Sequence, residues 1–249
     1  MKALIFAAGL GTRLKPLTDT MPKALVPIDG KPLLEHVILK LKAAGFNQII
    51  VNVHHFPDQI IEFLKSKNNF DLRIEISDER DKLLDTGGGV KKAKWFFDDG
   101  KPFLVHNVDI LSNIDLQSLY QQHLETLPLA TLVVSERDTF RYFLFDEEAR
   151  LKGWINEKTG EVRPDHLTHT ELYNKLAFSG IQVLSPDVFK LMKHFPDHFS
   201  IVDFYLRNAA QQQIKAYVPH ALKMIDVGKL NVLTEAERFV KNSENCECK

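Results

Sequence analysis

The sequence predicts an α/β fold in which a mostly parallel sheet carries helices on both faces. An apolar run of strand length, Lys2–Ala7, leads directly into the glycine loop Ala8–Arg13, which is how many α/β domains begin. From there to Val134, strand-like and helix-like patterns alternate. That alternation is typical of parallel sheets with crossover helices, whose ligands bind at the carboxyl ends of the strands. The glycine loop falls at such an end.

Each expected element in this part has its own pattern. From Leu33 to Leu41, apolar residues recur at helical spacing on one face, and Gly45 is suited to end that helix. Pro57 is tolerated in the first turn of the next helix. The expected strands are Lys2–Ala7, Gln48–Val53, Leu72–Ile76, Pro102–Val105 and Ala130–Val134, and the expected helices are Pro32–Ala44, Pro57–Lys67, Thr86–Phe97 and Leu116–Leu124.

The pattern changes in the second half of the chain. Tyr142–Phe145 and Leu151–Ile155, separated by a short polar stretch, predict a hairpin. The polar residues of Gly153–Thr170 predict a surface loop. Beyond it we expect strands at Leu176–Leu184, Ala216–Val218 and Lys223–Ile225, and helices at Asp187–Met192, Val202–Gln212 and Leu230–Val240.

Composition excludes several classes of protein. The 249 residues include 32 basic and 33 acidic ones, so the near-zero net charge of −1 provides no overall field for nucleic acid. No apolar run is long enough to span a membrane. The cysteines are Cys246 and Cys248, both in the polar tail, which excludes a disulfide framework and a cysteine zinc site. Because the N-terminal residues form a strand without a signal-peptide pattern, we expect a cytoplasmic protein.

The glycine loop and two cations after it predict a phosphate-binding site. Gly9–Arg13 lacks the third glycine of a dinucleotide fingerprint, because residue 14 is Leu14, and no P-loop sequence follows. Glycines let backbone N–H groups approach phosphate oxygens. Arg13 offers a planar fork for two oxygens, and Lys23, after Pro22, offers a point charge. Each feature alone would also fit a tight turn or a solvated side chain, but their combination favours a phosphate site.

Asp109 is a candidate metal ligand, whereas Asp226 on its own fits a turn or a helix cap. Asp109 follows an apolar strand, and Asp226 follows a short apolar strand near the other end of the chain. Mg²⁺ accepts one or two carboxylates together with phosphate oxygens. Asp109 also fits a turn or a helix cap, although Asp115 is the better cap candidate. We expect both aspartates to meet at one edge of the sheet.

A second glycine-rich segment, Thr86–Gly89, opens an expected helix. Three glycines in succession destabilise a helix by roughly 1 kcal/mol each relative to alanine, so they require a reason. A plain strand-to-helix turn needs only one glycine. We therefore expect a ligand to approach this backbone closely.

These segments together resemble the signature of sugar-1-phosphate nucleotidyltransferases. The matching residues are Ala7–Thr18, Pro22–Ile28 and Gly30–Leu33, and the similarity extends from Met1 to about Val240. Further segments are similar to N-acetylmuramate-1-phosphate uridylyltransferases, with mannose-1-phosphate guanylyltransferases as the nearby alternative. Those segments are Leu84–Gly89, Phe178–Ile181 and Ile225–Gly228.

The resemblance implies a Rossmann-like three-layer α/β/α fold with a mixed, mostly parallel sheet and a C-terminal sugar-side lid. It implies one domain over residues 1–241, with a nucleotide-binding half at 1–135, a sugar-binding half at 136–241 and a polar tail at 242–249. We expect a monomer or a small homo-oligomer without nucleic-acid or membrane partners.

The resemblance also implies the reaction. A nucleoside triphosphate and a sugar 1-phosphate would give a nucleoside-diphosphate sugar and pyrophosphate with Mg²⁺ as cofactor. The expected pair is UTP with N-acetylmuramate 1-phosphate or a related amino sugar, and the alternative is GTP with mannose 1-phosphate. A non-catalytic module that binds nucleotide sugars is the alternative of another class, although such a module has no need for two metal-binding aspartates.

The resemblance also assigns a role to each residue of the expected site. Arg13 would contact the triphosphate, Lys23 would neutralise the α-phosphate and the incoming sugar phosphate, and Asp109 and Asp226 would bind the metal. The expected nucleotide-binding residues are Ala8, Gly9, Gly11, Thr12, Thr86, Gly87 and Gly88, and the expected sugar-binding residues are Asn107, Lys175 and Gly180.

The sequence departs from the family pattern at two places. Val108 stands where the family has a glycine, which adds a side chain beside Asp109. The Glu-Lys pair that holds the sugar phosphate in many members has no convincing match. Glu157 and Lys158 lie in the polar segment and are expected to be solvated, so Lys175 is the candidate substitute.

Overall fold

The computed structural model describes residues 1–247 and divides the chain into two compact units. The first unit contains Met1–Leu83, Val105–Leu116 and the chain from Lys223 onward, and the second contains Leu84–Leu104 and Gln117–Leu222. No boundary between these units falls at residue 135. The expected division into a nucleotide-binding and a sugar-binding half at that position therefore stays a prediction.

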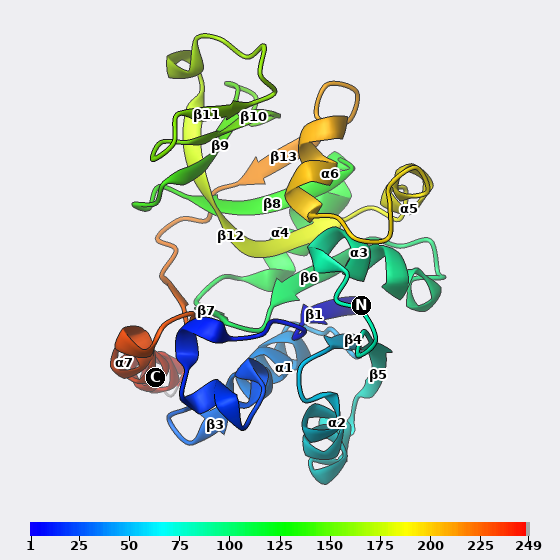
Figure 1. Cartoon of the computed structure of the whole chain (residues 1–249), viewed down its shortest axis with the longest axis vertical. Coiled ribbons are helices and arrows are strands. Elements are labelled where there is room, and N and C mark those ends of the chain that lie inside the picture. The colour runs from blue at the N-terminus through cyan, green and yellow to red at the C-terminus, as the bar shows by residue number, and fades with distance from the viewer. Residues whose placement is uncertain (248–249) are drawn as a thin grey trace. The chain divides into compact units, whose positions relative to one another are not determined.

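The first unit contains the parallel sheet that the alternating pattern predicts. β1 (Lys2–Phe6) pairs with β4 (Gln48–Val53), and β4 pairs with β5 (Arg73–Asp78), all in parallel. β6 (Phe103–Asn107), which enters this unit at Val105, lies on the other side of β1. Figure 1 shows α1 (Leu33–Ala43) leading to β4 and α2 (Pro57–Ser66) leading from β4 to β5.

Apolar side chains of these elements form the core of the first unit. Leu4 and Ile5 of β1 are completely buried, as are Leu34, Ile38 and Leu41 on the helical face that the sequence predicts for α1. After α1, Gly45 adopts a φ of +82°, and the amide of Phe46 donates to the carbonyl of Leu41. A glycine is favoured at this position because other residues are strained there.

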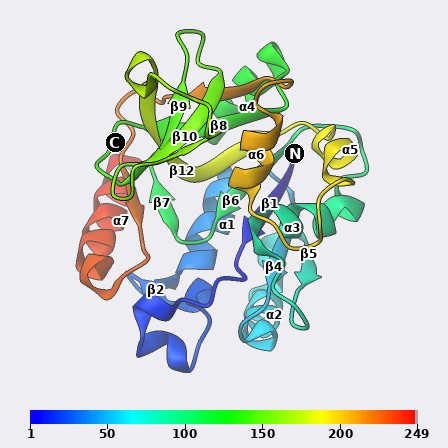
Figure 2. The same cartoon turned by 45° about the horizontal axis from the view of Figure 1, so that its top comes forward.

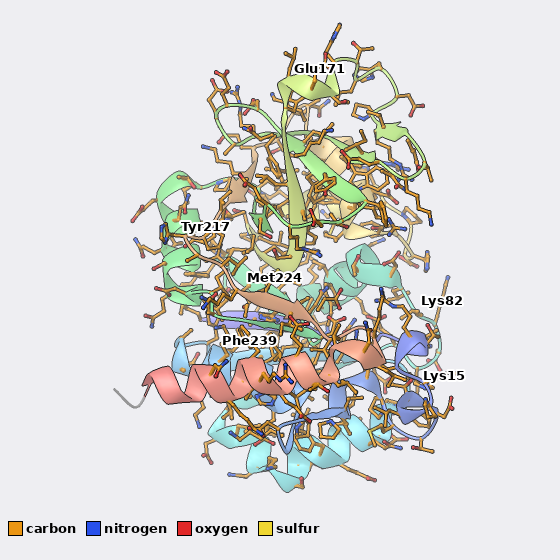
Figure 3. All side chains as sticks on the ribbon, turned by 90° about the vertical axis from the view of Figure 1, so that its left-hand side faces the viewer. Lys15, Lys82, Glu171, Tyr217, Met224 and Phe239 are labelled. Atoms are coloured by element: carbon orange, nitrogen blue, oxygen red, sulfur yellow. The ribbon has the colours of Figure 1, made fainter. Side chains whose placement is uncertain are left out.

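Two short antiparallel ladders complete the first unit. β2 (Pro27–Ile28) pairs with β3 (Lys31–Pro32), and β7 (Ile110–Ser112) pairs with β14 (Met224–Asp226), the strand on which Met224 is labelled in Figure 3. Only β14 is close to an element that the sequence predicts. The last helix, α7 (Leu233–Glu247), extends into the expected polar tail, because no proline or glycine interrupts its helix-favouring residues.

The second unit is built on antiparallel strands, with one parallel addition. β12 (Asn174–Leu184) is antiparallel to both β8 (Ala130–Ser135) and β9 (Arg141–Phe145), and β13 (Ile214–Tyr217) is parallel to β8. Figure 2 shows β8, β9, β10 and β12 together. β9 and β10 (Leu151–Asn156) form the expected hairpin.

The expectation of a surface loop over Gly153–Thr170 is wrong for part of that segment. β10 continues to Asn156, and β11 (Glu161–Arg163) pairs with it. The guanidinium of Arg163 lies 5.1 Å from the ring centre of Trp154 on β10 and 3.0 Å from the carboxylate of Asp203. The contacts of Arg163 with Trp154 and Asp203 therefore order a segment whose polarity alone predicted a loop.

Helices and aromatic rings complete the second unit. The ring centres of Phe97 and Phe103 lie 3.8 Å apart, and those of Phe103 and Phe189 lie 5.5 Å apart. The helices of this part are α3 (Asp85–Lys92), α4 (Leu116–Thr126), α5 (Val188–Met192) and α6 (Ile201–Asn208). In the part of the chain that the structure describes, no helix combines the length and apolarity needed to cross a membrane.

The expected fold class is confirmed. Parallel strands joined by crossover helices form the sheet of the first unit, and antiparallel strands in the second make the architecture mixed. The sugar-side role expected for residues 136–241 stays a prediction. The carboxyl ends of β1, β4 and β5 lie in register with one another, so the segments that follow these strands start at a common edge.

Candidate active site

In the glycine loop after β1, the space beside Gly9 is open and the space beside Gly11 is filled. A Cβ added to Gly9 would meet no atom within 4 Å. At Gly11, where φ is +63°, a Cβ would lie 2.8 Å from Cγ2 of Thr18 and 3.1 Å from Cβ of Lys23. The hydroxyl of Thr18 also donates to the carbonyl of Gly11 at 2.8 Å. Gly11 therefore lets the loop close against the segment that carries Lys23, whereas Gly9 leaves its backbone approachable.

Lys23 is a buried cation and not a solvated surface lysine. It is only 8 % exposed and starts a short 3-10 helix directly after Pro22. Its Nζ donates to Oδ2 of Asp109, and the two side chains are 10 % and 21 % exposed. Water screens the attraction between two such desolvated charges less than it screens a surface ion pair. The structure thus brings two of the expected site residues into direct contact.

Asp109 and Asp226 also come together, although by a different route from the one that the sequence suggests. Asp226 ends β14 opposite Ile110 of β7, and the amide of Val227 donates to the carbonyl of Asp109 at 2.8 Å. The ladder of β7 and β14 is a separate two-stranded sheet. The expectation that the ends of main-sheet strands would unite the two aspartates is therefore wrong, but their proximity is confirmed.

Arg13 and Asp226 both approach Gly228. A Cβ at Gly228 would lie 2.8 Å from Nη2 of Arg13 and 2.8 Å from Oδ1 of Asp226, so both groups approach the same point. The φ of Gly228 is not in the left-handed region, so this glycine serves close approach rather than a sharp turn. Arg13, Lys23, Asp109 and Asp226 form what we call the charged cluster, and all four belong to the first unit.

The turn that carries Asp109 is fixed from the core side. Val108 is only 4 % exposed, and its amide donates to the carbonyl of Phe6 at 3.1 Å, so the side chain added at the family's glycine position is buried. His106 is completely buried, and its Nδ1 donates to the carbonyl of Asn107 at 2.7 Å. Burial lowers the pKa of His106 to about 4, so its ring is neutral at pH 7. The sequence interpretation did not identify this histidine.

The second glycine-rich segment packs against the chain itself. A Cβ at Gly87 would lie 2.3 Å from the ring of Phe199, and one at Gly88 would lie 2.0 Å from the carbonyl oxygen of Asp197. Both glycine amides donate to the carbonyl of Phe199, at 2.9 and 3.2 Å. Thr86 is also engaged, because its hydroxyl accepts a hydrogen bond from the amide of Ile201 at 3.0 Å. Residues 197–199 therefore supply the close neighbour for which the sequence interpretation invoked a ligand.

The expected sugar-side residues Lys175 and Gly180 belong to the second unit. Lys175 Nζ donates to Oε1 of Glu157 at 2.9 Å, with the two side chains 38 % and 40 % exposed. Glu157 is thus paired rather than simply solvated. Gly180 has a φ of +73° within an irregularity of the ladder between β12 and β8, which explains a glycine there.

Comparison with known proteins shows similarity over nearly the whole chain. The family model described as Nucleotidyl transferase matches residues 2–243. The N-acetylmuramate alpha-1-phosphate uridylyltransferase of Caulobacter vibrioides is 46 % identical over 233 residues, which cover 89 % of this chain and 90 % of the relative. The protein of the same name from Neisseria meningitidis is 31 % identical, covering 95 % and 97 %. A mannose-1-phosphate guanyltransferase of Aspergillus fumigatus is 32 % identical over 79 % of this chain and 52 % of its own length.

Solved structures share the fold. HddC from Yersinia pseudotuberculosis, in complex with GMP-PN, superposes with a TM-score of 0.77 at 24 % identity, covering 96 % of this chain and 99 % of that one. UDP-glucose pyrophosphorylase from Acinetobacter baumanii superposes with a TM-score of 0.76 at 19 % identity, covering 95 % and 91 %. Because the family model spans nearly the whole chain, the protein belongs to the nucleotidyl transferase family and is an enzyme, a nucleotidyltransferase.

Proposed function

We propose that this enzyme transfers a uridylyl group from UTP to N-acetylmuramate 1-phosphate, or to a related amino-sugar 1-phosphate, and releases pyrophosphate. The observation that carries the reaction is the charged cluster, in which two cations and two carboxylates from distant parts of the chain lie together in the first unit. The uridine and amino-sugar assignment is supported by the relative that is 46 % identical across nine-tenths of both chains.

The reaction needs charge and positioning rather than an enzymic base. The attacking group is a phosphate oxygen of the sugar 1-phosphate, which is already ionised at pH 7. A bond forms between that oxygen and the α-phosphorus, and the bond from the α-phosphorus to the bridging oxygen breaks, so pyrophosphate leaves with the electron pair. Lys23 would supply positive charge at the α-phosphate, and Arg13 would hold two oxygens of the triphosphate.

Asp109 and Asp226 are the residues that would hold Mg²⁺. The donor set fits this ion, because Mg²⁺ is usually bound by one or two carboxylates together with phosphate oxygens and water. Among the residues that the structure describes, no group of three or more His, Cys, Asp or Glu side chains forms a purely protein-built metal site. When bound, Mg²⁺ would neutralise charge on the phosphate oxygens.

The remaining contacts are proposed for the two ends of the substrates. Ala8, Gly9, Gly11 and Thr12 would bind the nucleotide, and the open space beside Gly9 supports this role for that residue. Thr86, Gly87 and Gly88 are proposed for the base and ribose. Lys175, which pairs with Glu157, is proposed for the sugar phosphate, and Asn107 and Gly180 are proposed for the sugar. We further propose a cytoplasmic enzyme that acts as a monomer or a small homo-oligomer.

A matrix of nucleoside triphosphates against sugar 1-phosphates, read by pyrophosphate release with and without Mg²⁺, tests the proposal. We expect the highest kcat/KM with UTP and N-acetylmuramate 1-phosphate. The second candidate is GTP with mannose 1-phosphate, which the guanyltransferase relative favours. A higher kcat/KM for that pair would replace the first assignment. Absence of turnover with every pair, in folded protein, would instead indicate a module that binds nucleotide sugars without catalysis.

A further inference from the structure

A buried polar chain connects the ends of the three parallel strands β1, β4 and β5. The amide of Ala7, which follows β1, donates to Oδ1 of Asn52 on β4 at 2.7 Å. Nδ2 of Asn52 donates to Oε1 of Glu79, which follows β5, at 3.0 Å. Asn52 is 3 % exposed and Glu79 is 1 % exposed. We call these residues the Ala7–Asn52–Glu79 relay, and Figure 1 shows the strands that carry it.

The backbone of Glu79 is anchored independently of its side chain. Its amide donates to the carbonyl of Val53 at 2.7 Å. Its carbonyl accepts from Nδ1 of His54 at 2.7 Å and from the amide of Lys82 at 3.0 Å. Three hydrogen bonds thus fix the position from which the carboxylate reaches Asn52.

The carboxylate determines which way the Asn52 amide points. The carboxylate oxygen of Glu79 accepts a hydrogen bond from Asn52, whereas an amide side chain has one donor end and one acceptor end. Glu79 therefore selects the NH₂ end of Asn52, and the oxygen end must face the amide of Ala7. Burying a carboxylate is unfavourable unless it is well hydrogen-bonded. A buried glutamate at this position points to a role beyond simple packing.

We propose that Asn52 and Glu79 are positioning residues for the nucleotide, a role that rests on the proposed function. The relay holds the amide of Ala7, two residues before Gly9, beside which there is open space. A buried amide without an acceptor is unfavourable, so loss of the relay would shift this backbone until the amide finds another partner. Small displacements of binding groups lower catalytic efficiency strongly. Damage to the relay should therefore raise the KM for the nucleoside triphosphate and leave the KM for the sugar 1-phosphate unchanged.

Variants that exchange the amide and acidic side chains of Asn52 and Glu79 distinguish a positioning role from simple packing. Asn52→Asp places two carboxylates face to face, whereas Glu79→Gln keeps an acceptor for Asn52. In the double variant, the introduced glutamine can donate to the introduced aspartate, which still accepts from the amide of Ala7, so both hydrogen bonds return with one reversed. We expect affinity for the triphosphate to fall about tenfold or more in Asn52→Asp, to change by less than about threefold in Glu79→Gln, and to recover in the double variant.

The measurement is calorimetric binding of UTP and of GTP, each alone, to the full chain, with KM values for both substrates as a second readout. Thr131→Val is the matched control, because it removes the buried 2.8 Å hydrogen bond between the Thr131 hydroxyl and Nδ1 of His123 in the second unit. It should lower stability in urea without changing nucleotide affinity. If Asn52→Asp does not fold, the uncharged variant Asn52→Leu should show the same loss of nucleotide affinity.

The outcomes distinguish this role from the proposed function. Failure of the wild-type chain to bind either nucleotide overturns the proposed function and the positioning role with it. Nucleotide binding by the wild-type chain that is unchanged in a folded Asn52 variant overturns the positioning role alone. A folded double variant that still binds nucleotide poorly also overturns the positioning role, because its hydrogen bonds have been restored.

Discussion

The two glycine-rich segments look alike in sequence but differ in what approaches their backbones. In the loop after β1, a Cβ at Gly9 would meet nothing within 4 Å. In the segment that begins α3, a Cβ at Gly88 would lie 2.0 Å from the carbonyl oxygen of Asp197. A run of glycines therefore marks a backbone without side chains, and only the structure tells whether the space beside it is open, as at Gly9, or filled by the same chain, as at Gly88.

The charges near the two segments differ in the same way. The first loop faces Lys23, a buried cation paired with Asp109 and only 8 % exposed. Beside the second segment, Lys91 pairs with Asp197 at 3.0 Å, and that carboxylate is 76 % exposed. The first arrangement keeps charge in a poorly hydrated place, as catalysis by electrostatic stabilisation requires. The second is an ordinary surface ion pair that holds two segments together.

Removing the lysine in each region should give the largest difference. Lys23→Ala should lower kcat by about a hundredfold or more, as expected for the loss of one preorganised charge at the transition state. Lys91→Ala should leave kcat unchanged, because Lys91 is not part of the charged cluster, and its ion pair with Asp197 contributes only about 0–1 kcal/mol to stability. Steady-state kinetics on both variants, with urea unfolding as a check of the fold, make the comparison. An unchanged kcat/KM in Lys23→Ala would show that its burial serves structure alone.

The two aspartates should act as a unit. Asp109→Asn and Asp226→Asn should each raise the Mg²⁺ concentration at half-maximal rate by roughly tenfold or more, since a site with one carboxylate is much weaker. The double variant should be little worse than the worse single variant. Titration of Mg²⁺ at saturating substrates measures this, and Asp78→Asn, which disturbs an exposed pair with Arg80, is the control. Strictly additive losses would mean that the aspartates do not share a metal.

Much of the charged cluster could be predicted from local sequence patterns. The order of glycine loop, arginine and proline-lysine indicates Arg13 and Lys23, and the position of Asp109 after an apolar strand indicates that residue. Asp226 was assigned only through the resemblance to the family. The ladder of β7 and β14 that unites the aspartates has strands of three residues each, too short for a periodic signal. One member of the relay is visible in the sequence, because Asn52 is a polar residue inside an apolar strand. Its hydrogen-bond partners follow two other strands, so they can be identified only from the fold.

The second glycine segment was harder to interpret for a physical reason. The residues that fill the space beside Gly87 and Gly88 lie more than a hundred positions later, at Asp197 and Phe199. Nothing local marks that approach, so the sequence favoured a ligand. The interpretation of Gly153–Thr170 failed similarly, because the contacts of Arg163 with Trp154 and Asp203 order a polar stretch through side chains distant in sequence.

Substituting alanine for glycine tests the comparison at the backbone. Gly88→Ala should destabilise the protein by about 1–3 kcal/mol, the usual effect of forcing a methyl group into a packed place. Its Cβ would collide with a carbonyl oxygen, which cannot move as easily as a side-chain tip. Urea or thermal unfolding measures the loss. An unchanged midpoint would show that residues 197–199 can move away from these glycines.

Gly9→Ala should show the reverse pattern. Stability should change by less than about 0.5 kcal/mol, because the added methyl group enters open space and surface substitutions of this kind have small effects. The KM for the nucleoside triphosphate should rise roughly tenfold, because a misplacement of about 1 Å in a binding group is enough for losses of this size or more. Kinetics with the triphosphate varied give the result. A normal KM would show that the space beside Gly9 is not used by the nucleotide.

The smallest effect is expected at the sugar-side lysine, where the comparison is between a buried and a half-exposed cation. Lys175 is 38 % exposed and its partner Glu157 is 40 % exposed, so their pair adds only about 0–1 kcal/mol to stability. Lys175→Ala should therefore leave the unfolding midpoint nearly unchanged. If this lysine contacts the sugar phosphate, the KM for the sugar 1-phosphate should rise by roughly three- to tenfold while kcat stays within about twofold, since an interaction made equally in ground and transition states affects KM alone. Lys190→Ala, which breaks an exposed 2.7 Å pair with Asp187 in the same unit, is the matched control and should change neither constant. Equal KM values for the two variants would make Lys175 one more surface ion pair, and the sugar phosphate would then have to be held by another group.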